Sequence, residues 1–127
     1  MRDEVLRATL RVTKALSDLQ RVRILMMLQD GELCVCRIVG VLELAASTVS
    51  KHLSILSEAD LVEVRKDGRW AYYRLPQGKA GASARPVLKW LRESLAGDET
   101  IEKDLQKLRR VLSCDPESLC RAQRTRS

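Results

Sequence analysis

The stretch "LVEVRKDGRWAYYRL", residues 61–75, changes the periodicity of the chain. Val62 and Val64 alternate with charged residues, and an aromatic run begins at Trp70 after an Asp67-Gly68 pair. Asp-Gly between two β-prone runs is a strong signal for a hairpin. The segment therefore predicts a β-hairpin, and its tip carries three basic residues, Arg65, Lys66 and Arg69.

The residues before the hairpin follow a helical period instead. A short helix is predicted from apolar residues at i, i+3, i+4 and i+7, namely Val35, Ile38, Val39 and Leu42. After a turn at residues 43–45, a second helix begins near Ala45 and carries Val49, Leu53 and Leu56 inward. Two short helices joined in this way are typical of a helix-turn-helix, and the basic-tipped hairpin that follows makes it a winged helix.

Further helices flank this unit. Apolar periodicity predicts helices over residues 5–19, 17–30, 87–95 and 101–112, with Ser17 as the cap of the second. The predicted fold is therefore mainly α with one β-hairpin, a winged helix-turn-helix that dimerises through its terminal helices. We expect residues 1–112 to form the DNA-binding and dimerisation domain, and residues 113–127 to form a flexible tail containing Cys114 and Cys120.

Composition narrows the class of protein. The chain has 127 residues and a net charge of +6, and the segment 61–80 contributes a local basic excess. Apolar runs are too short to span a membrane and the N-terminus carries acids, so we expect a cytoplasmic protein. We find no phosphate-binding loop and no nucleophile paired with a base, and there is one histidine. These features argue against an enzyme.

Two of the four cysteines, Cys34 and Cys36, lie in "ELCVC" at the start of the helix over 35–42. Core packing, a strained disulfide and a redox pair are alternative roles for them. A helix N-terminus lowers a thiol pKa, and soft thiolates select ions such as As(III), Cd(II) and Pb(II). Residues i and i+2 diverge on a helix, so one ion can bind both thiols only if the first turn is extended or distorted.

Four segments together resemble the ArsR/SmtB family of bacterial metal-sensing repressors, and most of all its arsenical-resistance repressors. They are "KALSDLQRVRILMML" (14–28), "ELCVC" (32–36), "STVSKHLSILSEADLV" (47–62) and "RKDGRWAYYRL" (65–75). The resemblance implies an α-α-α-α-β-β-α homodimer that binds operator DNA and releases it when a metal binds. It also implies that Cys34 and Cys36 bind As(III) or Sb(III), or alternatively Cd(II) or Pb(II). Two features depart from the family pattern. Ala45 and Ala46 replace a capping residue and a Gln, and Val39 replaces a third cysteine.

The DNA contacts are predicted from the same segments. Candidates on the recognition helix are Ser47, Thr48, Ser50, Lys51 and His52, and candidates on the wing are Arg65, Lys66 and Arg69. A dyad would place two recognition helices in successive major grooves about 34 Å apart. His52 has a second reading, as a hydrogen-bonded structural residue.

The sequence does not decide which residues would bind a metal together with Cys34 and Cys36. Cys114 and Cys120 are candidates for further metal ligands, from the same subunit or its partner, or they form an unused tail pair. Three thiolates would suit As(III), and four would suit Cd(II) or Pb(II). A repressor of the same fold that responds to thiol oxidation is the alternative function.

Overall fold

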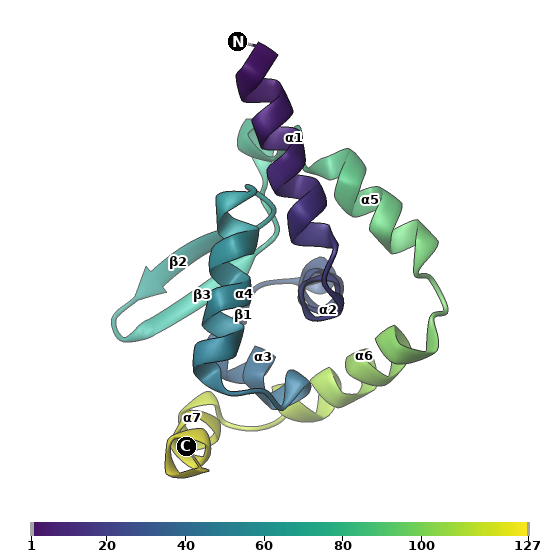
Figure 1. The fold of residues 1–127 in the computed structure, drawn as a ribbon. Helices are drawn as coiled ribbons and strands as arrows, with labels where there is room; N and C mark the ends of the chain where they lie inside the picture. The colour runs from purple at the N-terminus through teal and green to yellow at the C-terminus, as the bar shows by residue number, and fades with distance from the viewer. Residues whose placement is uncertain (1, 127) are drawn as a thin grey trace.

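The helix-turn-helix predicted from the sequence is present in the computed structural model, which describes residues 2–126. It consists of α3 (Val35–Leu42) and α4 (Ala46–Glu58), which are bent by 113° at the break between them. Glu43 makes the turn with a left-handed backbone, φ 57°. Figure 1 shows α4 beside the sheet and α3 below it.

The buried face of α4 is the predicted one, because Val49, Leu53 and Leu56 have no exposed surface. Ala45 stands at the N-cap and makes no side-chain hydrogen bond. An alanine has no acceptor to offer, so the first turn of α4 lacks the capping bond that Ser, Thr, Asp or Asn would provide.

The predicted hairpin is formed by β2 (Glu63–Asp67) and β3 (Trp70–Arg74), which are antiparallel. Asp67 pairs with Trp70, so the two-residue turn is Gly68 and Arg69, and Gly68 supplies a positive φ of 60°. A third strand, β1 (Leu33–Cys34), pairs with the other edge of β3 and gives the order β1-β3-β2. We did not predict β1, because two residues are too short to show a period.

Two helices precede this unit, α1 (Arg2–Leu16) and α2 (Leu19–Met27), and a 3-10 turn, η1 (Leu28–Asp30), extends α2. The predicted cap of α2 at Ser17 is wrong by one residue. Asp18 is the cap, and its Oδ1 accepts hydrogen bonds from the backbone N–H groups of Gln20 (2.8 Å) and Arg21 (3.2 Å). The Ser17 hydroxyl instead donates to the carbonyl of Lys14. Both residue types cap helices, so the sequence alone does not choose between them.

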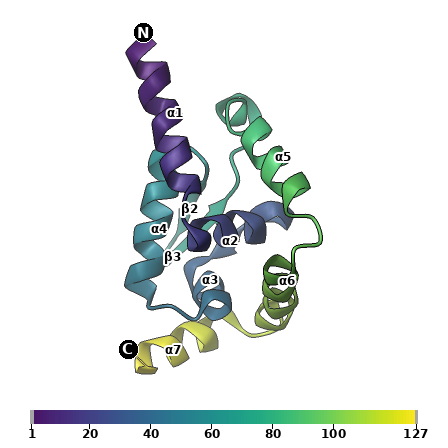
Figure 2. The same cartoon turned by 45° about the vertical axis from the view of Figure 1, so that its right-hand side comes forward.

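After the hairpin come η2 (Gly78–Gly81) and three helices, α5 (Arg85–Ser94), α6 (Glu99–Leu112) and α7 (Pro116–Arg126). The first two were predicted. Figure 2 shows α1 projecting upward next to α4, and α6 contacts α2 and α3. Within the described residues no single helix is long and apolar enough to cross a membrane; α3 and α4 pass that test only as a bent pair.

Helix α7 lies in the segment that was expected to form a flexible tail, and no helix was predicted there. Asp115-Pro116 ends α6, but it also begins α7, since the Asp115 carboxylate accepts from the backbone N–H of Ser118 (3.3 Å) and proline suits the first helical position. The same two residues therefore act as a stop and a start. Leu119 lies half-buried against the core and α7 contacts α3. The division into domains at residue 112 stays a prediction.

Candidate nucleic-acid interface and thiol site

Four of the five predicted contact residues on α4 lie on its exposed face, opposite the buried leucines. They are Ser47, Thr48, Ser50 and Lys51. Their short polar side chains and one cation are suited to base edges and phosphates. Their position agrees with a DNA-reading role, which stays a prediction.

His52, the fifth, turns towards α2, and its side chain is 15 % exposed. Its Nδ1 lies 3.2 Å from Nη1 of Arg21 and 3.9 Å from the Asp18 carboxylate. A guanidinium only donates, so Nδ1 must be the acceptor and the ring proton is assigned to Nε2. Arg21 also donates to the carbonyls of Ala15 (2.8 Å) and Lys14 (3.1 Å) at the end of α1. These contacts favour the structural reading of His52.

Two of the three predicted wing residues are Arg65 and Lys66, both exposed on β2. The Arg65 guanidinium donates to Glu32 at 2.5 Å and lies 4.6 Å from the ring centre of Tyr72. This hydrogen bond lowers the pKa of Glu32 below its usual value and raises that of Arg65. Arg65 is thus held against Glu32 and Tyr72, whereas Lys66 lies one residue nearer the turn.

The third wing residue, Arg69, sits in the turn and donates to Glu117 of α7. Its guanidinium also lies 5.2 Å from the ring centre of Trp70. A helix that was not expected from the sequence therefore engages one of the three predicted wing cations.

The CVC motif lies at the start of α3, as predicted, but its two cysteines belong to different elements. Cys34 ends β1 opposite Tyr72, with an extended backbone, and is 2 % exposed. Cys36 lies in the first helical turn. The chain therefore passes from an extended to a helical conformation between the two thiols.

Cys36 and Cys120 form a disulfide between α3 and α7, with Cα atoms 5.4 Å apart. This pairing was not predicted from the sequence, and the role of the cysteines as metal ligands stays a prediction. A separation of 84 residues gives no local signal for such a pair. Cys34 and Cys114 are free; Cys114 is exposed at the end of α6, where its thiol donates to the carbonyl of Arg110 at 3.6 Å.

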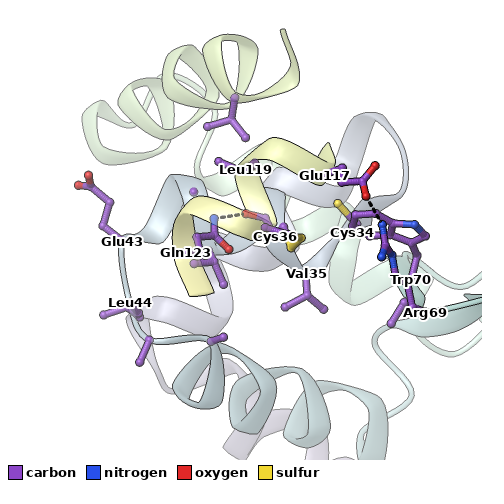
Figure 3. Close-up of a pocket in the computed structure, with 17 residues that line it drawn as sticks. Cys34, Val35, Cys36, Glu43, Leu44, Arg69, Trp70, Glu117, Leu119 and Gln123 are labelled. Carbon is purple, nitrogen blue, oxygen red and sulfur yellow. Dashed lines mark hydrogen bonds and ion pairs between the residues drawn. A yellow bond between two sulfur atoms is a disulfide. The ribbon is translucent and has the colours of Figure 1, made fainter. Parts of the chain in front are cut away.

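A cavity of about 730 Å³ lies between α3, the N-terminus of α4, β3 and α7. Cys34, Cys36 and Cys120 all line it, whereas Cys114 does not. Its apolar wall includes Val39, Leu44, Val111 and Leu119. Figure 3 shows α7 crossing the start of α3, with the Gln123 side chain donating to the carbonyl of Cys36 (2.8 Å) and Glu117 beside Arg69.

The donor set fits a thiophilic ion in chemistry but is not assembled in this geometry. Among residues 2–126, no three His, Cys, Asp or Glu side chains lie close enough to hold one ion. Within this range only two sulfur atoms, those of Cys36 and Cys120, lie close enough together to bind one ion. A third ligand would require movement of α7 or of the β1–α3 junction.

The sequence contained a signal for α7 that was not used. Pro116, Leu119, Cys120 and Gln123 stand at i, i+3, i+4 and i+7, so one helical face presents an apolar residue, a thiol and an amide together. Only the location of α3 shows what that face covers.

Comparison with known proteins agrees with this fold. A model of the arsR family of bacterial regulatory proteins matches residues 18–64. Homodimeric winged helix-turn-helix domain Mb0332 of Mycobacterium bovis has a TM-score of 0.62 and 30 % identity, covering 77 % of this chain and 91 % of that one. HlyU from Vibrio cholerae has a TM-score of 0.59 and 31 % identity, covering 69 % and 91 %.

Three relatives show similar sequences. The arsenic resistance regulator ArsR1 of Pseudomonas putida is 45 % identical over 65 residues, which are 50 % of this chain and 51 % of the relative. A cadmium resistance CadC homolog of Staphylococcus aureus is 42 % identical over 66 residues, 51 % and 54 %. The arsenical resistance operon repressor of Bacillus subtilis is 39 % identical over 75 residues, 58 % and 71 %. The chain spans about half the length of the first two.

Fold and comparisons together define a winged helix-turn-helix transcriptional regulator of the DNA-binding class, not an enzyme. The chain is 39 % and 30 % identical to two of these proteins, and it covers 71 % and 91 % of their lengths, which is enough to assign a family. The chain belongs to the ArsR family.

Proposed function

We propose that this protein is a homodimeric repressor that binds operator DNA and is released when As(III) or Sb(III) binds its cysteine thiolates. The observation that carries the proposal is the position of Cys34, Cys36 and Cys120 on one cavity, which also borders the N-terminus of the recognition helix. The names of arsenic-resistance relatives support the choice of inducer. We place the protein in the cytoplasm, where operator DNA is found.

The dimer is supported by apolar surface that the single chain leaves exposed. Val5, Leu6 and Leu10 on α1 and Trp90 on α5 are each more than half exposed. An isolated helix of 15 residues is only marginally stable in water, so the projecting half of α1 needs a partner. A second copy would cover these side chains and place two α4 helices on one operator.

Coupling between the thiols and DNA follows from their shared elements. Cys34 joins β1 to α3, and Cys36 lies in the first turn of α3, which packs against α4. A bound thiophilic ion supplies bonds to thiolate sulfur. Cys34 and Cys36 cannot close on one atom without displacing the start of α3, and the displacement reaches the helix that carries Ser47 and Lys51. DNA should weaken inducer binding by the same factor, because coupling is reciprocal.

A fluorescence-anisotropy titration of the reduced protein on its native operator tests the proposal. We expect As(III) and Sb(III) to lower DNA affinity, and Cys34→Ser with Cys36→Ser to keep DNA binding but abolish the response. Cys114→Ser is the matched control, since this exposed thiol lies off the cavity, and it should respond like the wild type. A double variant that still responds would move the inducer site elsewhere.

Two alternatives rest on specific observations. The Cys36–Cys120 disulfide favours a repressor that responds to thiol oxidation; release of DNA by peroxide without any metal, reversed by a reductant, would support it. The cadmium-resistance relative favours Cd(II) or Pb(II) as inducer. These ions suit four thiolates, so a response that requires Cys114 as well as the other three cysteines would identify them.

A further inference from the structure

Helix α7 lies beside both of the elements that are proposed to contact DNA. At its N-terminal end Glu117 accepts a hydrogen bond from Arg69, which sits in the turn of the wing. Ala45 and Ala46, at the start of α4, line the same cavity as Glu117 and Gln123 of α7. Figures 1 and 2 show α7 directly below α4, at the end where α4 begins. The helix therefore borders the predicted DNA-binding surface.

Contacts along one face of α7 fix its orientation. Leu119 packs over Gly40 of α3, and one of its methyl groups lies 3.6 Å from the point where a Cβ would stand. One residue further on, Cys120 is joined to Cys36. Gln123 donates to the carbonyl of Cys36 at 2.8 Å, as Figure 3 shows. These three residues of α7 form its inner face, so the opposite face is turned to solvent.

The solvent face of α7 is basic. It carries Arg121, which is exposed and directly follows Cys120 in the chain. The sequence of α7 has arginines at 121, 124 and 126 and a single acid, Glu117, which gives the helix a net charge of +2. That acid is already paired with the wing cation Arg69. The helix thus adds positive charge next to the wing.

The spacing along α7 suits a run of phosphates. Arg121 stands four residues after Glu117, which is about 6 Å along a helix axis. Glu117 marks the position of Arg69, because the two side chains are paired. One strand of DNA presents a phosphate about every 3.4 Å along the duplex axis. Arg69 and Arg121 are therefore offset on the scale that separates nearby phosphates, and a guanidinium can bind two phosphate oxygens at once.

We propose that α7 is a third DNA-contacting element of this protein, in which Arg121 binds a backbone phosphate beside those met by the wing; this rests on the operator binding proposed above. The partner is double-stranded DNA, because its charge is opposite to that of α7 and because α7 continues the surface predicted for α4 and the wing. The contact adds affinity without sequence preference, since phosphates carry no sequence information.

Fluorescence anisotropy of the full chain on its native operator, between roughly 50 and 200 mM salt, tests the proposal. Each phosphate contact contributes about 0.9 to the slope of log affinity against log salt. Arg121→Gln should lower the slope by about 0.9 for each bound copy, so its loss of affinity should be about three to four times larger per copy at the low-salt end than at the high-salt end. Both proteins are measured reduced and with the Cys36–Cys120 disulfide formed, and the effect is expected in the form that binds the operator more tightly.

Two further variants separate a phosphate contact from other roles of Arg121. Arg121→Lys keeps the cation, so it should keep the slope of the wild type. Arg92→Gln is the matched control, because it removes an exposed arginine from α5, and α5 and α7 lie at opposite ends of the molecule in Figures 1 and 2. Its slope should equal that of the wild type.

Three results would overturn the proposal. The first is an unchanged slope for Arg121→Gln, and the second is an equal change for Arg92→Gln or Arg121→Lys. The third is tighter operator binding by Arg121→Gln, which would show that α7 shields the wing from DNA.

Failure of this proposal is distinguishable from failure of the proposed function. If the wild type binds the operator and releases it with As(III), while Arg121→Gln keeps the slope, only the contact from α7 is refuted. If the wild type does not prefer the operator to a duplex of unrelated sequence, the proposed function fails. A lowered slope for Arg121→Gln on that unrelated duplex would still support the contact from α7.

Discussion

Arg21 connects the end of α1 to the recognition helix, since its Nη1 lies 3.2 Å from Nδ1 of His52 while its other donors reach Lys14 and Ala15. This single side chain is 9 % exposed and bonds three acceptors on two helices. It therefore ties the proposed dimerisation helix to the helix proposed to read DNA.

Replacing Arg21 by Met should lower the free energy of unfolding by about 2 kcal/mol, because buried acceptors lose hydrogen bonds to a charged donor. The measurement is urea denaturation, with Arg11→Met on the exposed face of α1 as control. Unchanged stability would show that water replaces the guanidinium at these carbonyls.

His52 and Lys51 should differ in how they affect DNA binding. We expect His52→Gln to weaken binding with an unchanged dependence on salt, because the ring faces Arg21 and not a phosphate. If Lys51 contacts phosphate, Lys51→Gln should reduce the slope of log affinity against log salt by about 0.9. Both slopes are measured by anisotropy titrations between roughly 50 and 200 mM salt. A reduced slope for His52→Gln would support a contact between His52 and a phosphate.

Asp18 should give α2 a pH-dependent stability. Burial alone would raise the pKa of its carboxyl, but hydrogen bonds from the backbone N–H groups of Arg21 and Gln20, together with the Arg21 charge, lower the pKa below its usual value. A lowered folded pKa stabilises the fold above the unfolded value, and the effect is lost as the pH falls through the folded pKa. Asp18→Ala should therefore cost about 1 kcal/mol at pH 7 and less below about pH 4. Asp18→Asn keeps a hydrogen-bond acceptor, so it should lower the free energy of unfolding at pH 7 by less than Asp18→Ala. Urea denaturation at several pH values measures these differences.

Arg23 and Asp104 form a two-fold hydrogen-bonded ion pair between α2 and α6, with both N–O distances 2.8 Å. Their side chains are 17 % and 7 % exposed. Removing one partner leaves a buried charge, so Asp104→Leu should cost about 3–5 kcal/mol. The double variant Arg23→Met with Asp104→Leu should recover much of that loss. A double variant as unstable as the sum of the single ones would mean that the pair is not coupled.

Glu117 should compete with DNA for Arg69. The pair is exposed, with side chains 61 % and 50 % accessible, so Glu117→Gln should change stability by less than about 1 kcal/mol. If Arg69 contacts a phosphate, the same change should raise DNA affinity. Arg69 then no longer has to give up its ion pair with Glu117 before it binds the phosphate. Glu93→Gln, which breaks the exposed pair with Lys89 on α5, is the control. Equal DNA affinities for Glu117→Gln and Glu93→Gln would show that the contact between α7 and the wing does not affect DNA binding.

Local pattern was sufficient for most of the fold. The 3.6-residue period of residues 35–56 and the alternation around Asp67-Gly68 predicted the helix-turn-helix and the wing, because burial of one face imposes those periods on the sequence. The four exposed residues of α4 followed from the same period. Where two neighbouring residues could cap a helix, or one Asp-Pro pair could end or begin one, pattern alone was ambiguous.

The sequence by itself determined the class of fold, the position of the CVC motif at the start of α3 and the exposed face of α4. The tertiary structure alone decided which cysteines meet, since Cys36 and Cys120 are 84 residues apart and the docking of α7 on α3 brings them together. It also decided that His52 faces Arg21 and that Arg69 faces Glu117. Periodicity reports which face of an element is buried, but the partner on that face depends on packing between distant segments, which no local pattern encodes.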